Sequence, residues 1–338
     1  FKRYQIQPVW RADRPQKGRY REFYQCDADI IGTDSLLCEL ELVQLFEDVF
    51  SKLGLKVLVE INKRKILSGI AEVLGEADRI IDITVAIDKL DKIGVEKVKE
   101  ELRGKGVSES AIIGLQPLLE FKGDSTQKLD LLKNLLATSE TGKKGIEEVE
   151  TLFGYASAFS FSHIRYELDI TLARGLNYYT GAIFEVKVAD ERSTFTSSIC
   201  GGGRYDDLTG IFGLPGMSGV GISFGADRIC DVLEEAGLYP ENASVTTQLL
   251  IVNFGAAEIP FAVKLTDQMR TAGVNAELYP DAAKMKKQFS YADARKIPYV
   301  LLAGEEEIKS GKLTLKNMST GTQESLTVSE IIEYLKKN

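Results

Sequence analysis

The spacing of apolar residues predicts regular secondary structure from the beginning of the chain. Between residues 36 and 53, leucine, valine and phenylalanine recur at intervals of three or four, which is typical of a helix with one buried face. Before this helix, two runs with strand character at 4–11 and 19–31 flank a loop that contains Pro15 and Gly18. The pattern therefore predicts a β-hairpin followed by an amphipathic helix.

The middle of the chain changes from helical to strand periodicity. Residues 76–153 form a series of amphipathic helical pieces separated by glycines, with little strand signal, and they predict an inserted helical module. Strand patterns dominate from residue 166 to residue 225. In this region and just before the insertion we expect strands at 56–61, 166–172, 182–188, 195–200 and 219–224, and helices at 64–74 and 226–236.

After a polar linker at residues 240–247, strand and helix patterns alternate to the end of the chain. This alternation predicts a compact α/β domain with its own core. We expect its strands at 249–254, 275–279, 299–303 and 312–317, and its helices at 259–272, 282–295 and 328–336. The expected domains are residues 1–75 together with 154–238, the helical insertion at 76–153, and the α/β domain at 247–338.

Composition limits the class of protein. The 338 residues are 44% hydrophobic and 27% charged, as in ordinary globular proteins, and no apolar run reaches the length of a membrane span. The four cysteines are scattered without a CxxC pair, which indicates reduced thiols in the cytoplasm rather than a zinc site or a disulfide framework. His163 is the only histidine, which excludes histidine-rich metal sites. The chain starts with Phe1 rather than methionine, and we expect further sequence before it.

Positive charge is concentrated at the start of the chain, although the net charge is -8. Seven lysines and arginines lie within the first 21 residues, against the single acid Asp13. Such a cluster in an acidic protein indicates a local anion site rather than a general polyanion surface. Alternation along the second hairpin arm would place on one face Arg19, Arg21, Phe23, Gln25, Asp27 and Asp29. A solvated hairpin with salt bridges is the alternative interpretation.

A second group of functional residue types lies at residues 171–181. Arg174 stands beside Gly175, shortly before Tyr178 and Tyr179, and a strand follows at once. An arginine at the mouth of a strand can hold an anion, and tyrosines offer flat rings and hydroxyl groups. The segment suits a small ligand that has a planar polar group and a negative charge. A surface loop with aromatic packing is the alternative.

Two glycine-rich segments follow. Residues 200–207 are expected to come directly after a strand, where missing side chains let a ligand approach the backbone, and a tight strand-to-helix turn is the alternative. Residues 219–228 predict a glycine-dotted strand that leads into a helix, without the glycine spacing of dinucleotide-binding or Walker loops. Arg228, in the first turn of this helix, can stack over a flat group on the strand. The alternative is an ion pair with Asp227 or Asp231.

In chain order, these segments resemble the histidyl-tRNA synthetases, a family of class II aminoacyl-tRNA synthetases. Residues 9–31 resemble the second class motif in its histidyl form, and residues 219–228 resemble the third. Residues 171–181 and 199–207 resemble the two histidine-specific signatures of the family, and the likeness covers essentially the whole chain. The resemblance implies an α+β catalytic domain with an antiparallel sheet of class II type, a helical insertion, and a C-terminal α/β anticodon-binding domain.

The resemblance also implies roles for individual side chains. Arg11 would hold the α-phosphate of ATP and the histidine carboxylate, with Arg174 opposite it across the reacting phosphorus. The implied ATP-binding residues are Arg11, Asp13, Arg19 at the γ-phosphate, and Phe23 and Arg228 on either side of the adenine. The implied histidine-binding residues are Arg11, Gln25, Asp29, Arg174, Tyr178 and Tyr179, and the implied pocket wall is Gly201, Gly202, Gly203 and Tyr205.

Two positions depart from the family pattern. Asp29 stands where some relatives carry glutamate, and the shorter carboxylate needs a slightly different pocket. Asn177 replaces a common aspartate, so we assign it no charged role. No protein residues are assigned to a metal, and Mg²⁺ is expected to bridge the phosphates of ATP.

The implied function is that of a histidine–tRNA ligase, which activates L-histidine with ATP and transfers it to tRNA(His) in the cytoplasm. A basic patch near one predicted helix either meets the tRNA or is a solvated face: Lys284, Lys286, Lys287 and Lys296. The resemblance implies a homodimer for the full-length protein, but the class motif that builds this interface is absent here, so dimerisation and activity of this segment alone stay open. A non-catalytic paralogue that regulates by binding histidine or tRNA is the alternative, and the retained Arg11, Arg174 and Arg228 favour the enzyme.

Overall fold

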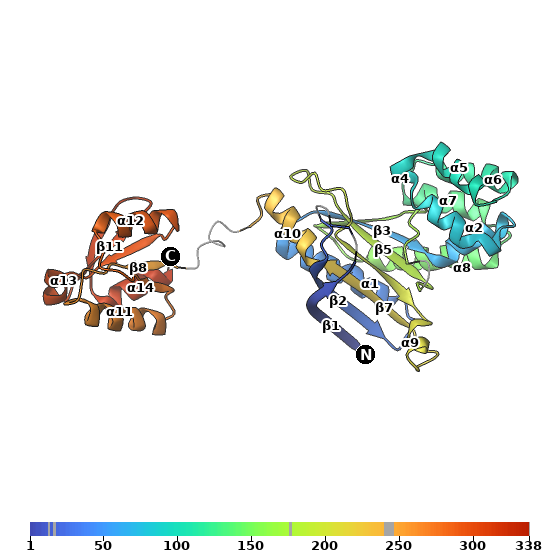
Figure 1. Cartoon of the computed structure of the whole chain (residues 1–338). Helices are drawn as coiled ribbons and strands as arrows, with labels where there is room; N and C mark the ends of the chain where they lie inside the picture. The colour runs from blue at the N-terminus through green and yellow to red at the C-terminus, as the bar shows by residue number, and fades with distance from the viewer. Residues whose placement is uncertain (13, 16–17, 176–177, 240–246, 338) are drawn as a thin grey trace. The chain divides into compact units, whose positions relative to one another are not determined.

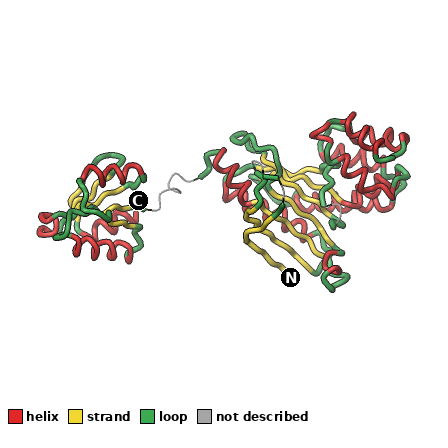
Figure 2. Tube along the Cα trace, in the orientation of Figure 1, coloured by secondary structure: helices red, strands yellow, loops and turns green. Residues whose placement is uncertain are grey.

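The computed structural model of the chain describes residues 1–12, 14–15, 18–175, 178–239 and 247–337. The chain forms two compact units, Phe1–Leu238 and Tyr239–Asn338, which are described one at a time (Figure 1). Each unit has its own sheet (Figure 2). Each also has its own buried hydrophobic core.

The first unit is built on a sheet of seven strands in the order β1-β2-β7-β6-β5-β3-β4. The strands are β1 (Lys2–Trp10), β2 (Glu22–Ile31), β3 (Val57–Lys63), β4 (Ile164–Leu168), β5 (Ala182–Val188), β6 (Cys200–Tyr205) and β7 (Gly219–Gly225). Neighbouring strands are antiparallel, except that β3 and β4 run parallel. Strands from opposite ends of the unit thereby lie side by side, because β2 pairs with β7.

Helix α1 (Leu37–Leu53) covers one face of this sheet (Figure 1). Phe46 and Phe50 of α1 are completely buried, and Phe46 meets Phe224 of β7 edge-on with ring centroids 5.5 Å apart. Such an aromatic pair contributes about 0.5–1.5 kcal/mol beyond the burial of its surface. The predicted helix at 36–53 therefore forms because its apolar stripe meets the apolar face of the sheet.

The opposite face of the sheet is polar and lined by small residues. In β2, the residues Cys26, Ala28 and Ile30 pack towards the core, so Gln25 and Asp29 belong to the other face. On this second face, every other residue of β7 is a glycine or a serine, at positions 219, 221, 223 and 225. The sheet therefore has a rigid aromatic side and an open side where a ligand can approach the backbone.

The segment between β3 and β4 folds into helices that gather at one end of the unit (Figure 1). Their bounds are α2 (Arg64–Val73), the short 3-10 helix η1 (Ala77–Arg79), α3 (Ile80–Ile87), α4 (Leu90–Ile93), α5 (Val95–Gly104), α6 (Glu109–Leu119), α7 (Ser125–Leu135) and α8 (Glu140–Ala156). They enclose a hydrophobic core of their own. Helices α2 and α8 touch through glycines, since a Cβ atom on Gly69 would lie only 2.5 Å from the Cα of Gly142. A Cβ atom on Gly145 would likewise lie 2.8 Å from the backbone nitrogen of Ile66, so α8 also packs closely against the start of α2.

The second hairpin arm starts later than the sequence pattern predicted. The strand begins at Glu22 rather than at Arg19, so Arg19 and Arg21 precede the strand and do not share its alternating face. The loop closes instead through a hydrogen bond from the Arg11 N–H to the carbonyl oxygen of Arg21 (2.9 Å). These residues are exposed around a turn, where alternation carries no information about facing.

The strand predicted at 195–200 is wrong, and so is the alternative of a turn at residues 200–207. The strand is β6, Cys200–Tyr205, and it contains the whole glycine run. Glycine has a low intrinsic strand propensity, so this strand depends on β5 and β7, which pair with it from both sides. Two further helices complete the unit, α9 (Leu208–Ile211) and α10 (Ala226–Glu235).

The second unit has a five-stranded sheet in the order β12-β11-β10-β8-β9. Strands β8 (Leu249–Ile251), β9 (Ala276–Leu278) and β10 (Tyr299–Leu302) are parallel, and β11 (Leu313–Asn317) and β12 (Gln323–Leu326) continue antiparallel. The helices are α11 (Ile259–Thr271), α12 (Met285–Ala294), α13 (Glu305–Ser310) and α14 (Val328–Lys337). The alternating α/β pattern predicted for this region is observed, whereas α13 and β12 were not expected from the sequence.

None of the helices in the described part of the chain is both long and apolar enough to cross a lipid bilayer.

Candidate active site

Three arginines from distant parts of the sequence line one cavity of about 560 Å³ in the first unit. Arg11 follows β1, Arg174 lies in the loop between β4 and β5, and Arg228 lies in the first turn of α10. Residues of β2, β6 and β7 complete the walls. The structure thus brings together the three arginines that the sequence patterns singled out separately.

The hairpin presents Arg11 over an aromatic ring. The guanidinium carbon of Arg11 lies 4.3 Å from the ring centroid of Phe23, which is a cation–π geometry. The Nε group of Arg11 donates a hydrogen bond to the carbonyl oxygen of Tyr20 (2.9 Å). These contacts hold the positive charge at the wall of the cavity.

Arg228 reaches from α10 to two backbone segments. Its Nε group donates to the carbonyl oxygen of Gly18 (2.5 Å), and its Nη1 group donates to that of Ser198 (2.6 Å). Burial lowers the pKa of the Arg228 guanidinium, and the nearby charges of Arg11, Arg174 and Arg19 lower this pKa further. The four positive charges are therefore close enough to repel one another.

Asp227 and Asp231 bind the hairpin rather than Arg228. The Tyr24 N–H donates to a carboxylate oxygen of Asp227 (2.6 Å), and the Tyr20 hydroxyl donates to Asp231 (2.8 Å). Among the described residues, the ion pair considered as an alternative role for Arg228 is therefore not formed. Helix α10 instead fastens the hairpin at several points.

Glu185 of β5 anchors Arg174. The Nη2 atom of Arg174 lies 2.6 Å from Oε1 of Glu185, and its Nη1 group donates to the Ser198 hydroxyl (3.0 Å). The Glu185 side chain is only 6% exposed, whereas that of Arg174 is 45% exposed. A buried carboxylate with a charge-assisted bond fixes the direction of the arginine while the cation stays accessible.

Tyr178 and Tyr179 form an aromatic wall of the cavity, with ring centroids 4.3 Å apart. Burial raises the pKa of the Tyr179 hydroxyl, and a hydrogen bond with Tyr178 raises this pKa further. The Tyr179 hydroxyl therefore stays protonated at neutral pH and can act as a hydrogen-bond donor.

The glycine run of β6 forms a surface without side chains beneath Tyr179. A Cβ atom on Gly203 would lie 2.5 Å from the carbonyl oxygen of Ala182 and 2.8 Å from a ring carbon of Tyr179. Only glycine lets β5 and the tyrosine ring approach this strand so closely.

Asp29 lies near Tyr179, but it lines a second hollow of the first unit rather than this cavity. Its Oδ1 atom accepts a hydrogen bond from the Tyr205 hydroxyl (2.7 Å), and the Arg3 Nε atom lies 3.9 Å from Oδ2. Burial raises the pKa of Tyr205, and its bond to Asp29 raises this pKa further. The charge of Asp29 also contributes to the raised pKa of Tyr179, so the two side chains are neighbours.

The expected site residues fall into three groups. Those that line the cavity are Arg11, Phe23, Gln25, Arg174, Tyr178, Tyr179, Gly201, Gly202 and Arg228. Those that are described but do not line it are Arg19, Asp29, Gly203 and Tyr205. Asp13 and Asn177 lie outside the described residues.

Sequence reasoning missed Glu185, Ser198 and Ser223. Glu185 is the only acidic residue in the mostly apolar strand at 182–188, and this signal could have revealed it, because a buried carboxylate requires a partner. Ser223 accepts a hydrogen bond from the Gln25 amide (2.7 Å), and Ser198 accepts one from Arg174. Neither serine is marked by any local pattern.

A larger hollow of about 710 Å³ lies elsewhere on the first unit, along β1, β2, α1 and residues 159–161. It contains none of the three converging arginines, and several of its walls are acidic, with Glu41, Glu47 and Asp48. The convergence of cationic groups, rather than size, therefore identifies the candidate site.

Two protein families match most of the chain. The family described as "Histidyl-tRNA synthetase" matches residues 3–229, and that described as "Anticodon binding domain" matches residues 248–338. The curated "Histidine--tRNA ligase" of Phocaeicola vulgatus is 60% identical over 336 residues, an alignment that covers 99% of this chain and 73% of that protein. The chain belongs to the histidyl-tRNA synthetase family.

Other members support the same fold. The "Histidine--tRNA ligase" of Bacteroides fragilis strain YCH46 is 58% identical over 337 residues, which cover 100% of this chain and 73% of that relative. The crystal structure of histidyl-tRNA synthetase from Nostoc sp. PCC 7120 superposes with a TM-score of 0.85 at 31% identity, covering 100% of this chain and 78% of that one. The predicted class II catalytic fold with an anticodon-binding domain is therefore confirmed.

We expect Gly203→Ala to lower the free energy of unfolding of this synthetase by about 1–3 kcal/mol, because the new methyl group would overlap Ala182 and Tyr179. Urea unfolding followed by circular dichroism measures the change. Gly210→Ala is the matched control, since its Cβ atom would lie 3.6 Å from Pro215, an ordinary contact distance. Equal unfolding midpoints for the two variants would contradict the close approach at Gly203.

Proposed function

We propose that this synthetase activates L-histidine with ATP to form histidyl-adenylate and then transfers the histidyl group to tRNA(His). The observation that carries the proposal is the position of Arg11, Arg174 and Arg228 around one cavity. Triphosphate and carboxylate are both anions, and guanidinium groups bind such groups with directed, charge-assisted bonds. Membership of the histidyl-tRNA synthetase family supports the same reaction.

We assign the ATP side of the cavity to residues of the hairpin and α10. Arg11 would hold the α-phosphate, while Phe23 and Arg228, which both line the cavity, would take the adenine between them. Arg19 does not line the cavity, but its charge acts on Arg228. A cation outside the cavity lining but near Arg228 suits the outer end of a triphosphate, so we assign Arg19 to the γ-phosphate.

We assign the histidine side to Arg174, Gln25 and the tyrosine pair. Arg174 and Arg11 would share the carboxylate, and Gln25 would lie near the amino group. The protonated Tyr179 hydroxyl can donate to one imidazole nitrogen, and Asp29 can accept from the other. A histidine ring needs both partners, because leaving a buried polar group unpaired costs about 1–3 kcal/mol.

The geometry suits an in-line displacement. The histidine carboxylate attacks the α-phosphorus, a new C–O–P linkage forms, and pyrophosphate leaves. Negative charge grows on the nonbridging oxygens, where Arg11 and Arg174 would stabilise it from two sides. Glu185 keeps Arg174 oriented before the reaction begins. In the second step, a terminal ribose hydroxyl of the tRNA attacks the histidyl carbonyl carbon, and AMP leaves.

Mg²⁺ enters this scheme as part of the MgATP substrate. No group of three or more histidine, cysteine, aspartate or glutamate side chains is arranged to hold a metal ion in the parts of the chain that the structure describes. Mg²⁺ usually keeps several waters and binds substrate phosphates rather than an all-protein cage. Loss of activity on chelation with EDTA, reversed by added Mg²⁺, is the expected behaviour.

We expect Arg174→Ala to reduce histidine-dependent ATP–pyrophosphate exchange by roughly 10²-fold or more, since it removes a charge that stabilises the transition state. The secondary structure should be retained, although the free energy of unfolding should fall because the buried Glu185 carboxylate loses its partner. Exchange rates and circular dichroism spectra together measure the two effects. Arg165→Ala, at an exposed position of β4, is the control and should stay active. Exchange near the normal rate in Arg174→Ala would refute this role.

A non-catalytic paralogue that binds histidine or tRNA as a regulator is the alternative function. Such a protein needs a pocket but has no need for cations on both sides of a reacting phosphorus. Arg11 and Arg174 both line the cavity, and Glu185 holds Arg174 in place, which supports the enzyme. Histidine binding without any histidine-dependent pyrophosphate exchange would favour the regulator.

We propose three domains: a catalytic domain at 1–75 and 154–238, an insertion at 76–153, and an anticodon-binding domain at 247–338. The separate core of the second unit supports the last boundary. The exposed basic residues at and after α12 are proposed to meet tRNA phosphates: Lys284, Lys286, Lys287 and Lys296. Removing residues 247–338 should abolish tRNA charging but leave pyrophosphate exchange. Equal loss of both activities would contradict this division.

We propose that the full-length protein is a homodimer. Strand β1 is an edge of the sheet, and its side chains Tyr4, Ile6 and Trp10 are 80%, 62% and 68% exposed. An exposed apolar patch on a sheet edge marks an interaction surface. Sedimentation should show a dimer that Ile6→Lys weakens, with Ile113→Lys, at another exposed position, as the control. A wild-type protein that stays monomeric at all concentrations would overturn the proposal.

We place this reaction in the cytoplasm. All four cysteines are free thiols, which supports a reducing compartment. Recovery of the protein in the membrane or secreted fraction of the cell would contradict this assignment.

A further inference from the structure

The loop that carries Arg174 and the two tyrosines is fastened at both ends to one junction, where β3 meets α2. At the start of the loop, the Asn62 side-chain amide donates to the carbonyl oxygen of Leu172 (2.9 Å). At its end, the Arg64 N–H donates to the carbonyl oxygen of Gly181 (2.8 Å). The junction therefore fixes where the loop leaves the sheet and where it returns.

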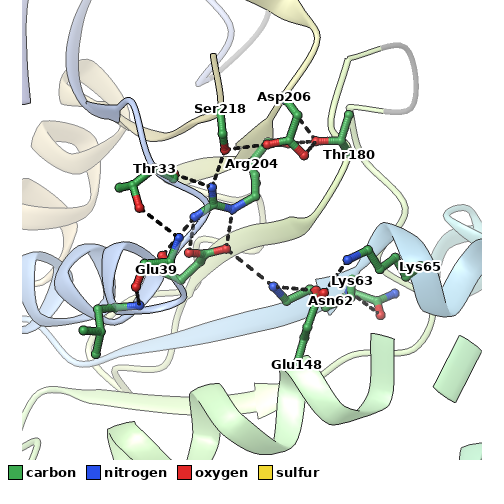
Figure 3. Close-up of polar contacts among 12 residues, drawn as sticks. Thr33, Glu39, Asn62, Lys63, Lys65, Glu148, Thr180, Arg204, Asp206 and Ser218 are labelled. Carbon is green, nitrogen blue, oxygen red and sulfur yellow. Dashed lines mark hydrogen bonds and ion pairs between the residues drawn. The ribbon is translucent and has the colours of Figure 1, made fainter. Parts of the chain in front are cut away.

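A third attachment comes from β6 and the residues after it. The Thr180 N–H donates to the carbonyl oxygen of Arg204 (2.8 Å), and the Thr180 hydroxyl donates to Asp206 (2.6 Å). Asp206 also accepts from the Ser218 hydroxyl (2.5 Å), which itself accepts from Arg204 (2.6 Å). Figure 3 shows this group beside the junction. The end of the loop is thus hydrogen-bonded to the end of the glycine strand and to Asp206.

Buried charged side chains lie next to the junction. Lys63 and Glu39 of α1 are completely buried, and Arg204 is 5% exposed. The Lys63 Nζ atom lies 3.5 Å from Glu39 and 3.3 Å from Glu148 of α8. Glu39 in turn accepts two hydrogen bonds from Arg204, at 2.8 and 2.6 Å. Figure 3 shows these contacts as a continuous chain from Arg204 to Glu148.

Lys63 depends on the carboxylate that α8 contributes, because the other nearby acid of the network, Asp206, acts on Arg204. Lys63 and Arg204 carry two positive charges, and Glu39 supplies one negative charge that two bonds already commit to Arg204. Glu148 supplies the second negative charge. Without it, Lys63 would be a buried cation without full compensation, which is strongly unfavourable.

Lys65 is also paired with Glu148, but it cannot play the same part. Its side chain is 32% exposed, so water can replace the carboxylate there. The Lys63 side chain is 0% exposed and has no such access. Lys63, which lies inside the junction, is therefore the residue that requires the Glu148 carboxylate.

We infer that Glu148 is a positioning residue for the histidine site: through its ion pair with Lys63, helix α8 holds the junction to which the loop of Arg174 is attached at Leu172 and Gly181. The inference rests on the proposed function, since that function gives the loop its role in binding histidine. It makes the helical layer and the histidine loop one coupled unit. A ligand that moves α8 away from Lys63 would loosen the loop, although α8 itself does not line the cavity.

Glu148→Gln tests this, because it keeps the shape of the side chain and removes its charge. We expect the backbone amides of residues 178–180 to exchange hydrogen roughly tenfold faster, because the loop opens locally more often. In pyrophosphate exchange, the KM for histidine should rise about fivefold, while the KM for ATP stays within about twofold. The two KM values should respond differently because the junction is hydrogen-bonded to Leu172 and Gly181, at the ends of the loop assigned to histidine.

Glu150→Gln is the matched control on the same helix. Glu150 forms an exposed ion pair with Lys133, with side chains 42% and 49% exposed, so its loss should change neither readout. Lys63→Met added to Glu148→Gln removes both charges of the buried pair. In the Lys63→Met background, Glu148→Gln should therefore change loop protection and the KM for histidine far less than it does in the unmodified protein, because the ion pair is already absent.

Unchanged amide exchange and an unchanged KM for histidine in Glu148→Gln would overturn the inference and leave the proposed function intact. An equal effect of Glu148→Gln in the unmodified protein and in the Lys63→Met background would also overturn it. If the unmodified protein showed no histidine-dependent exchange, the proposed function would fail, while amide exchange would still decide whether Glu148 holds the loop. If Glu148→Gln does not fold, Glu148→Asp lengthens the same ion pair and should shift both readouts in the same direction.

Discussion

Three like charges are held around one cavity, and much of the first unit serves to keep them there. Buried Glu185 holds Arg174, two carbonyl oxygens hold Arg228, and the carbonyl oxygen of Tyr20 holds Arg11. These partners are protein groups at the cavity wall rather than mobile surface acids, so salt screens them less. The lowered pKa of Arg228 reflects the remaining repulsion. An anion that enters the cavity relieves this repulsion, which is why the same groups suit both phosphate and carboxylate.

The two faces of the sheet have different roles: one forms the rigid core, and the other is accessible to ligands. On one face, α1 packs phenylalanines against the strands and closes a core that excludes water. On the other face, glycines and serines leave the backbone open to ligands. Strand β6 belongs to both faces, since Gly201 and Gly203 lie on the face of Tyr179 while Arg204, on the other face, is hydrogen-bonded to Glu39. A strand with few side chains to pack is thus held mainly by one buried ion pair and by its neighbours.

The sequence predicted secondary structure correctly where a single apolar periodicity runs through a whole helix or strand. The strand at 182–188, the helix after Gly225 and the helix around Phe46 agree with their apolar patterns to within a few residues. It failed at β6, because a run of glycines carries no apolar period and the strand exists only between its partners. It also failed at Arg19, where the hairpin turns before the strand begins.

What the sequence determined by itself is the set of local elements, the family signatures and the identity of the three arginines. These depend on neighbours three, four or two positions apart, so a short window contains the whole signal. Only the tertiary structure decided that Glu185 meets Arg174 and that Glu148 meets Lys63. Such pairs join residues far apart in the chain, and strand register and burial bring them together. A buried charge selects its partner by distance in space, which no local pattern records.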